Sequence, residues 1–238
     1  MKTPRNVLVA GASSGIGEAI ARAFAEQGDT VTATGATEAE VNAAMGRNDP
    51  SVRFVQLDVR DGPAVTALVS ALGDLDVLVN CAGIIRRGQE HDPEVFEQVL
   101  DINLVGTMRL CAAARDGLAN KGGCIINTAS MLSFFGGGLV PAYSASKGGV
   151  AQLTKSLAIA YAAEGIRVNA VAPGWIATPL TQALQDDPER SGAILGRTPL
   201  GRWGKPDDVA DPVVFLASPA ARFITGVILP VDGGYLIQ

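Results

Sequence analysis

Short apolar runs alternate with longer helical stretches along the chain, and this alternation limits the possible folds more than any other feature. Seven runs rich in apolar and β-branched residues are typical of buried strands. They are Val7 to Ala10, Thr30 to Thr34, Val52 to Leu57, Val77 to Asn80, Cys124 to Asn127, Arg167 to Val171 and Val227 to Val231. Apolar residues recur at helical spacing between most of them, over Gly15 to Gln27, Pro63 to Leu72, Pro93 to Ala119, Tyr143 to Ala163 and Pro206 to Leu216. The alternation predicts a doubly wound, Rossmann-like α/β fold, in which helices cover both faces of a parallel sheet of about seven strands.

Composition and length agree with this fold. Hydrophobic residues make up 47% of the chain and charged residues 18%, which suits a sheet covered on both faces. With 238 residues, one domain spanning residues 1–238 is expected. The least regular segment, 173–204, contains prolines at 173, 179, 188 and 199. It follows the sixth strand, so it is expected to form a lid over the substrate, although an ordinary surface loop remains the alternative.

Charge and polar residue content exclude several classes of function. A net charge of -5 without a basic stripe argues against nucleic-acid binding. No apolar run approaches the roughly 20 residues that span a bilayer, and the first apolar segment is too short for a signal peptide, so a cytoplasmic protein is expected. The three cysteines lack C-x-x-C spacing, which argues against disulfides and a metal site. His91 is the only histidine and lies in a polar stretch, which argues against a Ser-His-Asp hydrolase.

A glycine-rich turn follows the first predicted strand, with the sequence Gly11-Ala12-Ser13-Ser14-Gly15-Ile16-Gly17. Glycines let a backbone approach a pyrophosphate closely, and the N–H groups of the next helix attract the anion. A plain tight turn remains the alternative, but the position between a strand and a helix favours a dinucleotide site.

Tyr143 and Lys147 are four residues apart at the start of a predicted helix and therefore project from one face. A cation beside the phenol favours the phenolate and is expected to lower a tyrosine pKa that is normally about 10. Tyr143 is then a candidate for proton transfer. Packing of the ring against the aliphatic lysine stem is the alternative. Ser130 lies 13 positions earlier (143 − 130), just past the fifth strand, where its hydroxyl could bond a substrate oxygen.

Several motifs occur in the order found in the short-chain dehydrogenase/reductase family, and the chain resembles this family over nearly its whole length. The motifs are the glycine turn, Asp58-Val59, Asn80-Cys81-Ala82-Gly83, Asn103, Ser130, Tyr143-Ser144-Ala145-Ser146-Lys147, and Pro173-Gly174 with Thr178. The resemblance implies interconversion of a secondary alcohol and a ketone, with Asn103, Ser130, Tyr143 and Lys147 as catalytic residues. It implies that Lys147 holds the nicotinamide ribose and that Asn103 helps keep a water near it, although local backbone bonding is the alternative for Asn103.

The resemblance also implies a set of residues that bind NAD(P). They are Gly11, Ser13, Ser14, Gly15, Ile16, Gly17, Asp58, Val59, Asn80, Ala82, Gly83, Tyr143, Lys147, Pro173, Gly174, Ile176 and Thr178. Two positions depart from the family pattern: Ala10 replaces a usual threonine, and Cys81 replaces an asparagine. The second strand ends in Thr34-Gly35-Ala36-Thr37, without a basic partner for a 2′-phosphate, so NAD(H) is favoured and NADP(H) is not excluded.

Closer resemblance to the sugar-acid members lies in four features: Ala82-Gly83-Ile84-Ile85-Arg86-Arg87, Ala129-Ser130-Met131-Leu132-Ser133-Phe134, the following Gly137 and Pro141, and Gly201-Arg202-Trp203-Gly204. These members comprise the 2-deoxy-D-gluconate 3-dehydrogenase, 2-keto-3-deoxy-D-gluconate dehydrogenase and gluconate 5-dehydrogenase group. A sugar acid or related keto acid is therefore the expected small-molecule substrate. Ser130 and Tyr143 are expected to bind its reacting oxygen, and Arg87, or less favourably Arg86, its carboxylate. Solvated arginines paired with Glu90 or Asp92 are the alternative.

Two other functions remain open at this point. One is reduction of 3-oxoacyl groups on a carrier protein, which the acidic chain disfavours. The other is a non-catalytic dinucleotide sensor, which has no need of Ser130, Tyr143 and Lys147 together. The family resemblance also implies a homotetramer in which the Ala-rich stretches of the helices around 93–119 and 143–163 pack against partner chains.

Overall fold

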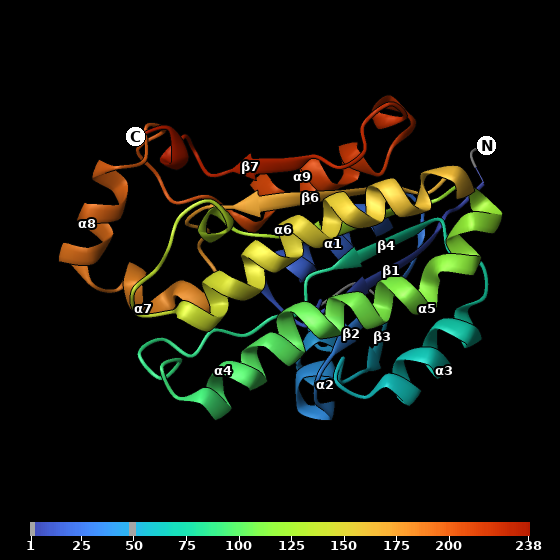
Figure 1. The fold of residues 1–238 in the computed structure, drawn as a ribbon, viewed down its shortest axis with the longest axis horizontal. Coiled ribbons are helices and arrows are strands. Elements are labelled where there is room, and N and C mark those ends of the chain that lie inside the picture. The colour runs from blue at the N-terminus through green and yellow to red at the C-terminus, as the bar shows by residue number, and fades with distance from the viewer. Residues whose placement is uncertain (1–2, 48–50) are drawn as a thin grey trace.

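One parallel sheet forms the centre of the molecule (Figure 1). A computed structural model describes residues 3–47 and 51–238. The strands follow the order β3-β2-β1-β4-β5-β6-β7, and every neighbouring pair is parallel. They are β1 (Asn6–Ala10), β2 (Thr30–Gly35), β3 (Val52–Gln56), β4 (Val77–Asn80), β5 (Cys124–Thr128), β6 (Arg167–Pro173) and β7 (Ile228–Val231). The predicted α/β fold and all seven strands are confirmed.

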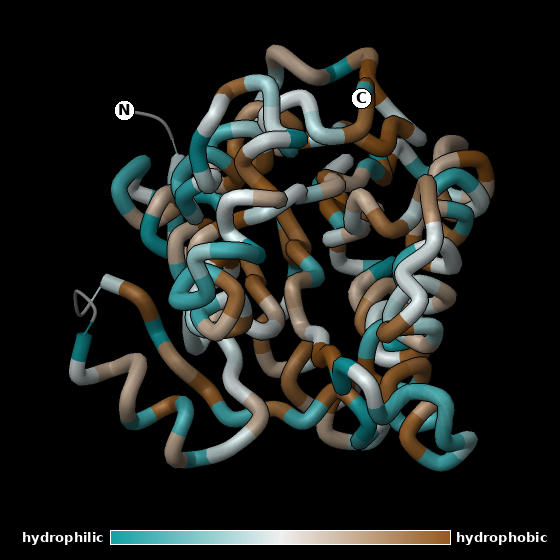
Figure 2. Tube along the Cα trace, turned by 90° about the vertical axis from the view of Figure 1, so that its left-hand side faces the viewer, coloured by the Kyte–Doolittle hydropathy of each residue, from teal (hydrophilic) through white to brown (hydrophobic). Residues whose placement is uncertain are grey.

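Helices cover both faces of this sheet. On one face α1 (Gly15–Glu26) packs with α9 (Pro206–Leu216), and Phe24 and Leu216 are buried between helix and sheet. On the other face lie α3 (Gly62–Leu72), α5 (Gly106–Lys121) and α6 (Pro141–Tyr161). Figure 2 shows hydrophobic segments concentrated in the interior and many hydrophilic segments on the outer helices and loops. The continuous apolar strands follow from this arrangement, because both faces of each central strand are buried.

Two regions differ from the expected helix pattern. The helix expected over 93–119 is divided into α4 (Pro93–Leu100), a π-helical turn (Asp101–Val105) and α5. A short helix that was not expected, α2 (Glu38–Met45), follows β2, and its first turn is capped because Thr37 Oγ1 accepts a hydrogen bond from Glu40 N at 3.2 Å. Of these two differences, only α2 directly follows a strand, whereas the π-helical turn lies between α4 and α5.

The predicted lid contains more helix than its sequence suggested. It holds the 3₁₀ turn Pro179–Thr181 and the short helices α7 (Gln182–Gln185) and α8 (Pro188–Gly196). In Figure 1 these elements extend past the arrowheads of β6 and β7, beyond the carboxyl ends of the strands. The segment therefore lies where a lid was expected, and its movement stays a prediction.

The direction of chain crossover reverses between β1 and the central strand, β4. In an open α/β sheet the ligand crevice lies beyond the carboxyl ends of the strands at such a point. Within residues 3–47 and 51–238 no helix is long and apolar enough to cross a membrane. Over the same ranges no cluster of His, Cys, Asp or Glu is arranged for a metal ion, and the three cysteines are free thiols.

Candidate active site

The glycine turn after β1 brings three segments into close contact. Gly11 has a φ of 75°, and a Cβ placed on it would lie 2.4 Å from the Cα of Ala82. A Cβ on Gly17 would lie 2.2 Å from the carbonyl oxygen of Gly11. Ser14 precedes α1, and its side chain caps none of the N–H groups in the first turn. These N–H groups and the helix dipole are suited to an anion such as a pyrophosphate.

Two adjoining cavities follow the carboxyl ends of β1 to β5, with volumes of about 250 and 290 Å³. Both are lined by Gly11, Ser14, Cys81 and Gly83. The smaller cavity adds Ser13, Asp58, Val59 and Ala82, and the larger adds Gly15, Ile16, Gly17, Tyr143, Lys147 and Thr178. Most of the residues predicted to bind a dinucleotide are therefore brought together. Their glycine turn, helix N-terminus and elongated crevice fit NAD(P).

Asn80 was predicted to bind the cofactor, but its side chain lies in the core. It is 4% exposed, and its Nδ2 donates to Asn127 Oδ1 at 2.9 Å and to Cys111 Sγ at 3.3 Å. Asn127 in turn donates to Thr154 Oγ1 at 2.9 Å. This polar network joins β4, β5 and α6 beneath the crevice, so Asn80 supports the sheet edge and does not line the cavities.

Glu40 lines the smaller cavity and was missed from the sequence. Its Oε2 accepts a hydrogen bond from Ala36 N at 2.8 Å and lies 3.4 Å from Ser13 Oγ. A carboxylate therefore lies at the end of β2, although Thr34-Gly35-Ala36-Thr37 contains no acidic residue. The sequence Thr37-Glu38-Ala39-Glu40 has capping-box spacing. This spacing predicts the start of a helix, with the side chain of Glu40 directed back towards the end of the strand.

The predicted catalytic side chains lie at the boundary between the dinucleotide crevice and a third cavity. This third cavity, of about 350 Å³, contains Ser130 and Tyr143, whereas the adjoining crevice contains Tyr143 and Lys147. Tyr143 thus faces both spaces. Ser130 is 6% exposed, and its Oγ accepts a hydrogen bond from Leu132 N at 3.1 Å, which fixes the hydroxyl at the end of β5.

Burial, and not the neighbouring lysine, dominates the acidity of Tyr143. Desolvation raises the pKa of Tyr143 to about 12, although a hydrogen bond with Ser130 acts in the opposite direction, and the negative charge of Glu90 raises the pKa further. Burial also lowers the pKa of Lys147 to about 8. The expectation that Lys147 lowers the tyrosine pKa is wrong for this structure, in which Lys147 Nζ lies 5.6 Å from the centroid of the Tyr143 ring. Tyr143 is therefore protonated at neutral pH.

Lys147 and Asn103 are held by hydrogen bonds to neighbouring loops. Lys147 Nζ donates to the carbonyl of Thr128 at 2.7 Å. Asn103 is fully buried in the π-helical turn; its Oδ1 accepts from Ile84 N at 2.8 Å, and its Nδ2 donates to Ile84 O at 2.9 Å and to Ser146 Oγ at 3.1 Å. The backbone partner of Asn103 is therefore Ile84, 19 residues away, and not the local backbone considered as the alternative. These bonds join the loop after β4 to α6.

Glu90 is a second residue that the sequence did not reveal as part of the site. Its carboxylate is 1% exposed and accepts hydrogen bonds from Arg86 N and from Tyr143 N, both at 2.8 Å. The helix α6 begins at Pro141, and the preceding N-cap residue, Val140, provides no side-chain cap. A buried anion from another loop satisfies the first turn of this helix instead. In the alternative considered for the two arginines, their side chains pair with Glu90 or Asp92, but the carboxylate of Glu90 bonds backbone N–H groups.

Arg87 lines the third cavity, and Arg86 is not among the residues that do. The predicted residues Pro173, Gly174, Ile176 and Thr178 line it from the opposite side, after β6. Arg190 of α8 also lines it, a contribution that the irregular sequence of this segment did not indicate. Among the described residues of this lining there is no Asp or Glu, so the cavity favours an anionic ligand.

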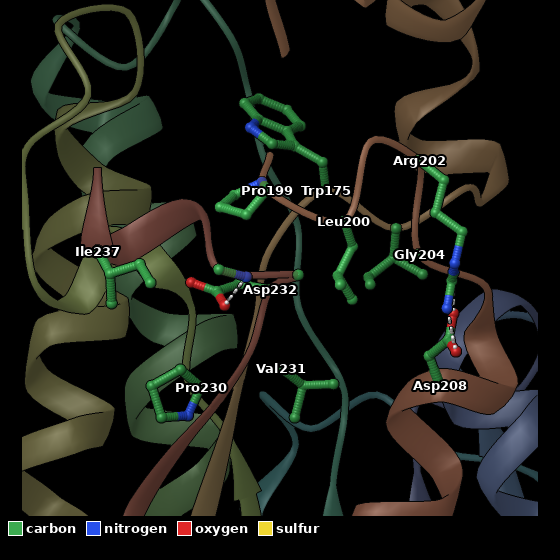
Figure 3. Close-up of a pocket in the computed structure, with 13 residues that line it drawn as sticks. Trp175, Pro199, Leu200, Arg202, Gly204, Asp208, Pro230, Val231, Asp232 and Ile237 are labelled. Carbon is green, nitrogen blue, oxygen red and sulfur yellow. Dashed lines mark hydrogen bonds and ion pairs between the residues drawn. The ribbon is translucent and has the colours of Figure 1, made fainter. Parts of the chain in front are cut away.

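A further cavity of about 550 Å³ shares Trp175 and Ile176 with the lining of the third cavity (Figure 3). Arg202 and Asp208 form an ion pair at its edge, at 2.6 Å, and Ile237 lies at the opposite side. Ser130, Tyr143 and Lys147 do not line it. Its size therefore does not make it the site of the chemistry, which requires these groups.

Comparison with known proteins identifies the group to which this architecture belongs. A family model described as enoyl-(acyl carrier protein) reductase matches residues 11–236, from the glycine turn to the end of the last strand and beyond. The chain belongs to the short-chain dehydrogenase/reductase family. It is thus an oxidoreductase that acts on CH–OH groups with NAD(P).

Three relatives show the range of substrates and cofactors near this short-chain dehydrogenase/reductase. A 2-dehydro-3-deoxy-D-gluconate 5-dehydrogenase from Pseudoalteromonas atlantica is 43% identical over 244 residues, covering 96% of this chain and 94% of the relative. A cis-4-hydroxycyclohexanecarboxylate dehydrogenase from Sinomonas cyclohexanicum is 43% identical over 242 residues, covering 97% and 96%. A crystal structure from Agrobacterium tumefaciens, described as a putative 2-deoxy-D-gluconate 3-dehydrogenase with bound NADP, is 41% identical, has a TM-score of 0.88 and covers 98% and 97%.

The two departures from the family pattern have visible consequences. Ala10 is fully buried, and the N–H of Gly11 bonds Thr34 Oγ1 at 3.2 Å, so a threonine of β2 steadies the glycine turn. Cys81 lines both dinucleotide cavities, and its Sγ lies 3.0 Å from Thr128 Oγ1. Burial raises the pKa of the Cys81 thiol, which keeps it in the unreactive protonated form.

Proposed function

We propose that this short-chain dehydrogenase/reductase interconverts the secondary alcohol and the ketone of a hydroxy acid, a sugar acid or a related keto acid. In the reduction, the phenol of Tyr143, which is the form present at neutral pH, would give its proton to the oxygen of the ketone and become a phenolate. In the oxidation, that phenolate form would take the hydroxyl proton of the alcohol and return to the phenol. A bound nicotinamide ring supplies or accepts the hydride; the chain binds the substrate, orients it and moves the proton.

The proposed roles follow from the positions of the side chains. Ser130 and Tyr143 share the third cavity, so both hydroxyls can bond the reacting oxygen. Lys147 lines the adjoining dinucleotide cavity and is held by Thr128, which suits a contact to the ribose. Asn103 fixes the loop at Ile84, from where it can help to hold a water near Lys147.

The observation that carries the substrate class is the position of Arg87 in the same cavity as Ser130 and Tyr143. No hydrogen bond or ion pair engages the Arg87 side chain among the residues the structure describes, so its guanidinium can bind a carboxylate in a bidentate manner. Arg190 forms an ion pair with Asp187 at 3.3 Å and is therefore the weaker candidate. The relatives named above include dehydrogenases of a sugar acid and of a hydroxycyclohexane acid. Assay of Arg87→Ala on an acid and on its neutral ester tests the proposal.

Two alternatives are less well supported. Reduction of 3-oxoacyl groups on an acidic carrier protein requires a basic docking surface, and the chain carries a net charge of -5. A dinucleotide sensor without catalytic activity does not require a protonatable tyrosine and a serine facing one substrate-sized cavity.

We further propose that NAD(H) is preferred over NADP(H). Glu40 lines the cavity at the end of β2, where its carboxylate can accept hydrogen bonds from ribose hydroxyls and repel a 2′-phosphate. Arg60 lines the same cavity, but its guanidinium is bound to Asp58 at 2.6 Å. Binding of NADP by the Agrobacterium relative makes this preference a specific prediction for the present chain.

Replacement of Glu40 by glutamine is expected to reduce the preference for NADH over NADPH by about tenfold, equivalent to about 1.4 kcal/mol. The substitution removes the charge that repels the phosphate and weakens a ribose contact. Dissociation constants for NADH and NADPH, measured by titration of nucleotide fluorescence, provide the test. Glu38→Gln is the matched control, because Glu38 lies on the same first turn of α2 and does not line the cavity. A wild-type protein that binds NADPH tenfold more tightly than NADH contradicts the prediction.

We also propose a homotetramer, which the family resemblance implies. Apolar side chains are exposed along two of the long helices: Met108 of α5 is 37% exposed and Ile159 of α6 is 81% exposed. Such residues are suited to contact with partner chains. Light scattering coupled to size-exclusion chromatography is expected to give a mass near four times 24.5 kDa, and a monomeric mass would contradict the proposal.

A further inference from the structure

The third cavity, which is the proposed substrate cavity, has few polar side chains that are free to bond a ligand. Its walls are largely hydrophobic, formed by Ile16, Ile85, Ala129, Met131, Leu132, Val140, Pro173, Ile176, Leu180, Ala183 and Leu184. The polar side chains of the lining are Arg87, Thr128, Ser130, Tyr143, Trp175, Thr178, Thr181 and Arg190. Binding cavities are commonly apolar, so the number of polar side chains that are free to bond a substrate limits which substrates fit.

Three of the polar side chains have tasks in the proposed reaction. Ser130 and Tyr143 face the reacting oxygen, and Arg87 faces the carboxylate. A hydroxyl elsewhere on the substrate therefore has to bond one of the remaining groups.

Three threonines of the lining are occupied by bonds within the protein. Thr181 Oγ1 donates to the carbonyl of Ile176 at 2.6 Å and accepts from Thr178 N at 3.1 Å. Thr178 Oγ1 lies 3.4 Å from Thr181 Oγ1, and Thr178 also borders the crevice beside Gly15. Thr128 Oγ1 lies 3.0 Å from Cys81 Sγ, on the dinucleotide side. These contacts fix the hydroxyls and reduce their capacity to bond a substrate.

Arg190 and Trp175 are the two remaining polar groups of the lining. The guanidinium of Arg190 is paired with Asp187 at 3.3 Å, and the Nε1 of Trp175 is buried without a hydrogen-bond partner among the residues that the structure describes. The lining therefore offers few side-chain partners beyond those for a carboxylate and a reacting oxygen.

We propose that the preferred substrates are hydroxy acids with an apolar carbon skeleton, which carry few hydroxyls besides the reacting one. This inference rests on the proposed function, because it takes the carboxylate contact at Arg87 as given. Polyhydroxylated sugar acids are then poorer substrates. Each hydroxyl that enters the cavity without a partner loses its bonds to water and gains none in return.

A matched pair of ring acids tests the proposal. The first is cis-4-hydroxycyclohexanecarboxylate, with one hydroxyl, and the second is 3,4,5-trihydroxycyclohexanecarboxylate, which has the same ring and two more hydroxyls. The enzyme is expected to oxidise the first with a kcat/KM at least about tenfold higher, since a factor of ten corresponds to about 1.4 kcal/mol of lost pairing. Equal or faster turnover of the trihydroxy acid, or turnover of neither, overturns the proposal.

A pair of variants tests whether the hydrophobic wall of the cavity causes the preference for the monohydroxy acid. Leu184→Asn places an amide on the wall and is expected to reduce the ratio of the two kcat/KM values severalfold. Leu200→Asn is the control, because Leu200 is 67% exposed and lines the further cavity of about 550 Å³. A ratio unchanged by Leu184→Asn, or changed equally by both variants, contradicts the assignment of the wall.

The methyl ester of the first acid separates this proposal from the proposed function. If the ester and the acid are turned over equally, the carboxylate contact is wrong. If the acid is preferred and the trihydroxy acid is nevertheless the better substrate, the carboxylate contact holds and the inference about the apolar skeleton is wrong.

Discussion

Tyr143→Phe is expected to lose nearly all turnover and to bind NADH as the wild-type protein does. The phenol stands at the boundary between the dinucleotide crevice and the substrate cavity, and its oxygen is the proposed proton donor and acceptor. Phenylalanine retains the ring and its packing on α6 but has no proton to transfer. Because a positioned acid or base contributes roughly 10²- to 10⁴-fold to the rate, kcat is expected to fall by about a thousandfold or more.

The protonation state of Tyr143 indicates which direction of the reaction its neutral form serves. Burial raises the pKa of Tyr143 to about 12, so the group is protonated at neutral pH, which is the form that donates a proton to a ketone. Steady-state rates in both directions and a fluorescence titration of NADH provide the measurements. A Tyr143→Phe protein with a kcat near that of the wild type would show that another group transfers the proton.

Arg87→Ala is expected to reduce kcat/KM for an acidic substrate by about a hundredfold, with a far smaller effect on the neutral ester. An unpaired guanidinium at a cavity without described acidic residues can hold a carboxylate through two charge-assisted hydrogen bonds. Loss of about 2.7 kcal/mol corresponds to that factor. NADH affinity is expected to stay unchanged, because Arg87 lines neither dinucleotide cavity.

Arg86→Ala provides the matched control for this experiment. Arg86 is the preceding residue and is also exposed, but it does not line the substrate cavity. Its replacement is expected to leave the ratio of acid to ester turnover unchanged. Equal losses on the acid and the ester in Arg87→Ala would indicate that Arg87 supports the loop, and equal behaviour of the two variants would exclude a specific carboxylate contact.

The sequence by itself determined the fold and the order of the motifs. Strands that are buried on both faces are continuously apolar, so the apolar runs around Leu8 and Ile126 were sufficient to predict β1 and β5. Spacing also predicted that Tyr143 and Lys147 share one helix face. Adjacent arginines are equivalent in such a pattern, however, because only the path of the loop after β4 decides which side chain reaches the cavity.

Tertiary structure alone decided the electrostatics and the fine geometry of the site. The π-helical turn holds Asn103, whose partners Ile84 and Ser146 are 19 and 43 residues away, so local spacing could not indicate it. Glu90 caps α6 from 53 residues away. The acidity of Tyr143 depends on how completely water is excluded, and burial raises its pKa although a lysine lies four residues along the helix. Desolvation depends on every segment that packs around a group, and no window of sequence contains that information.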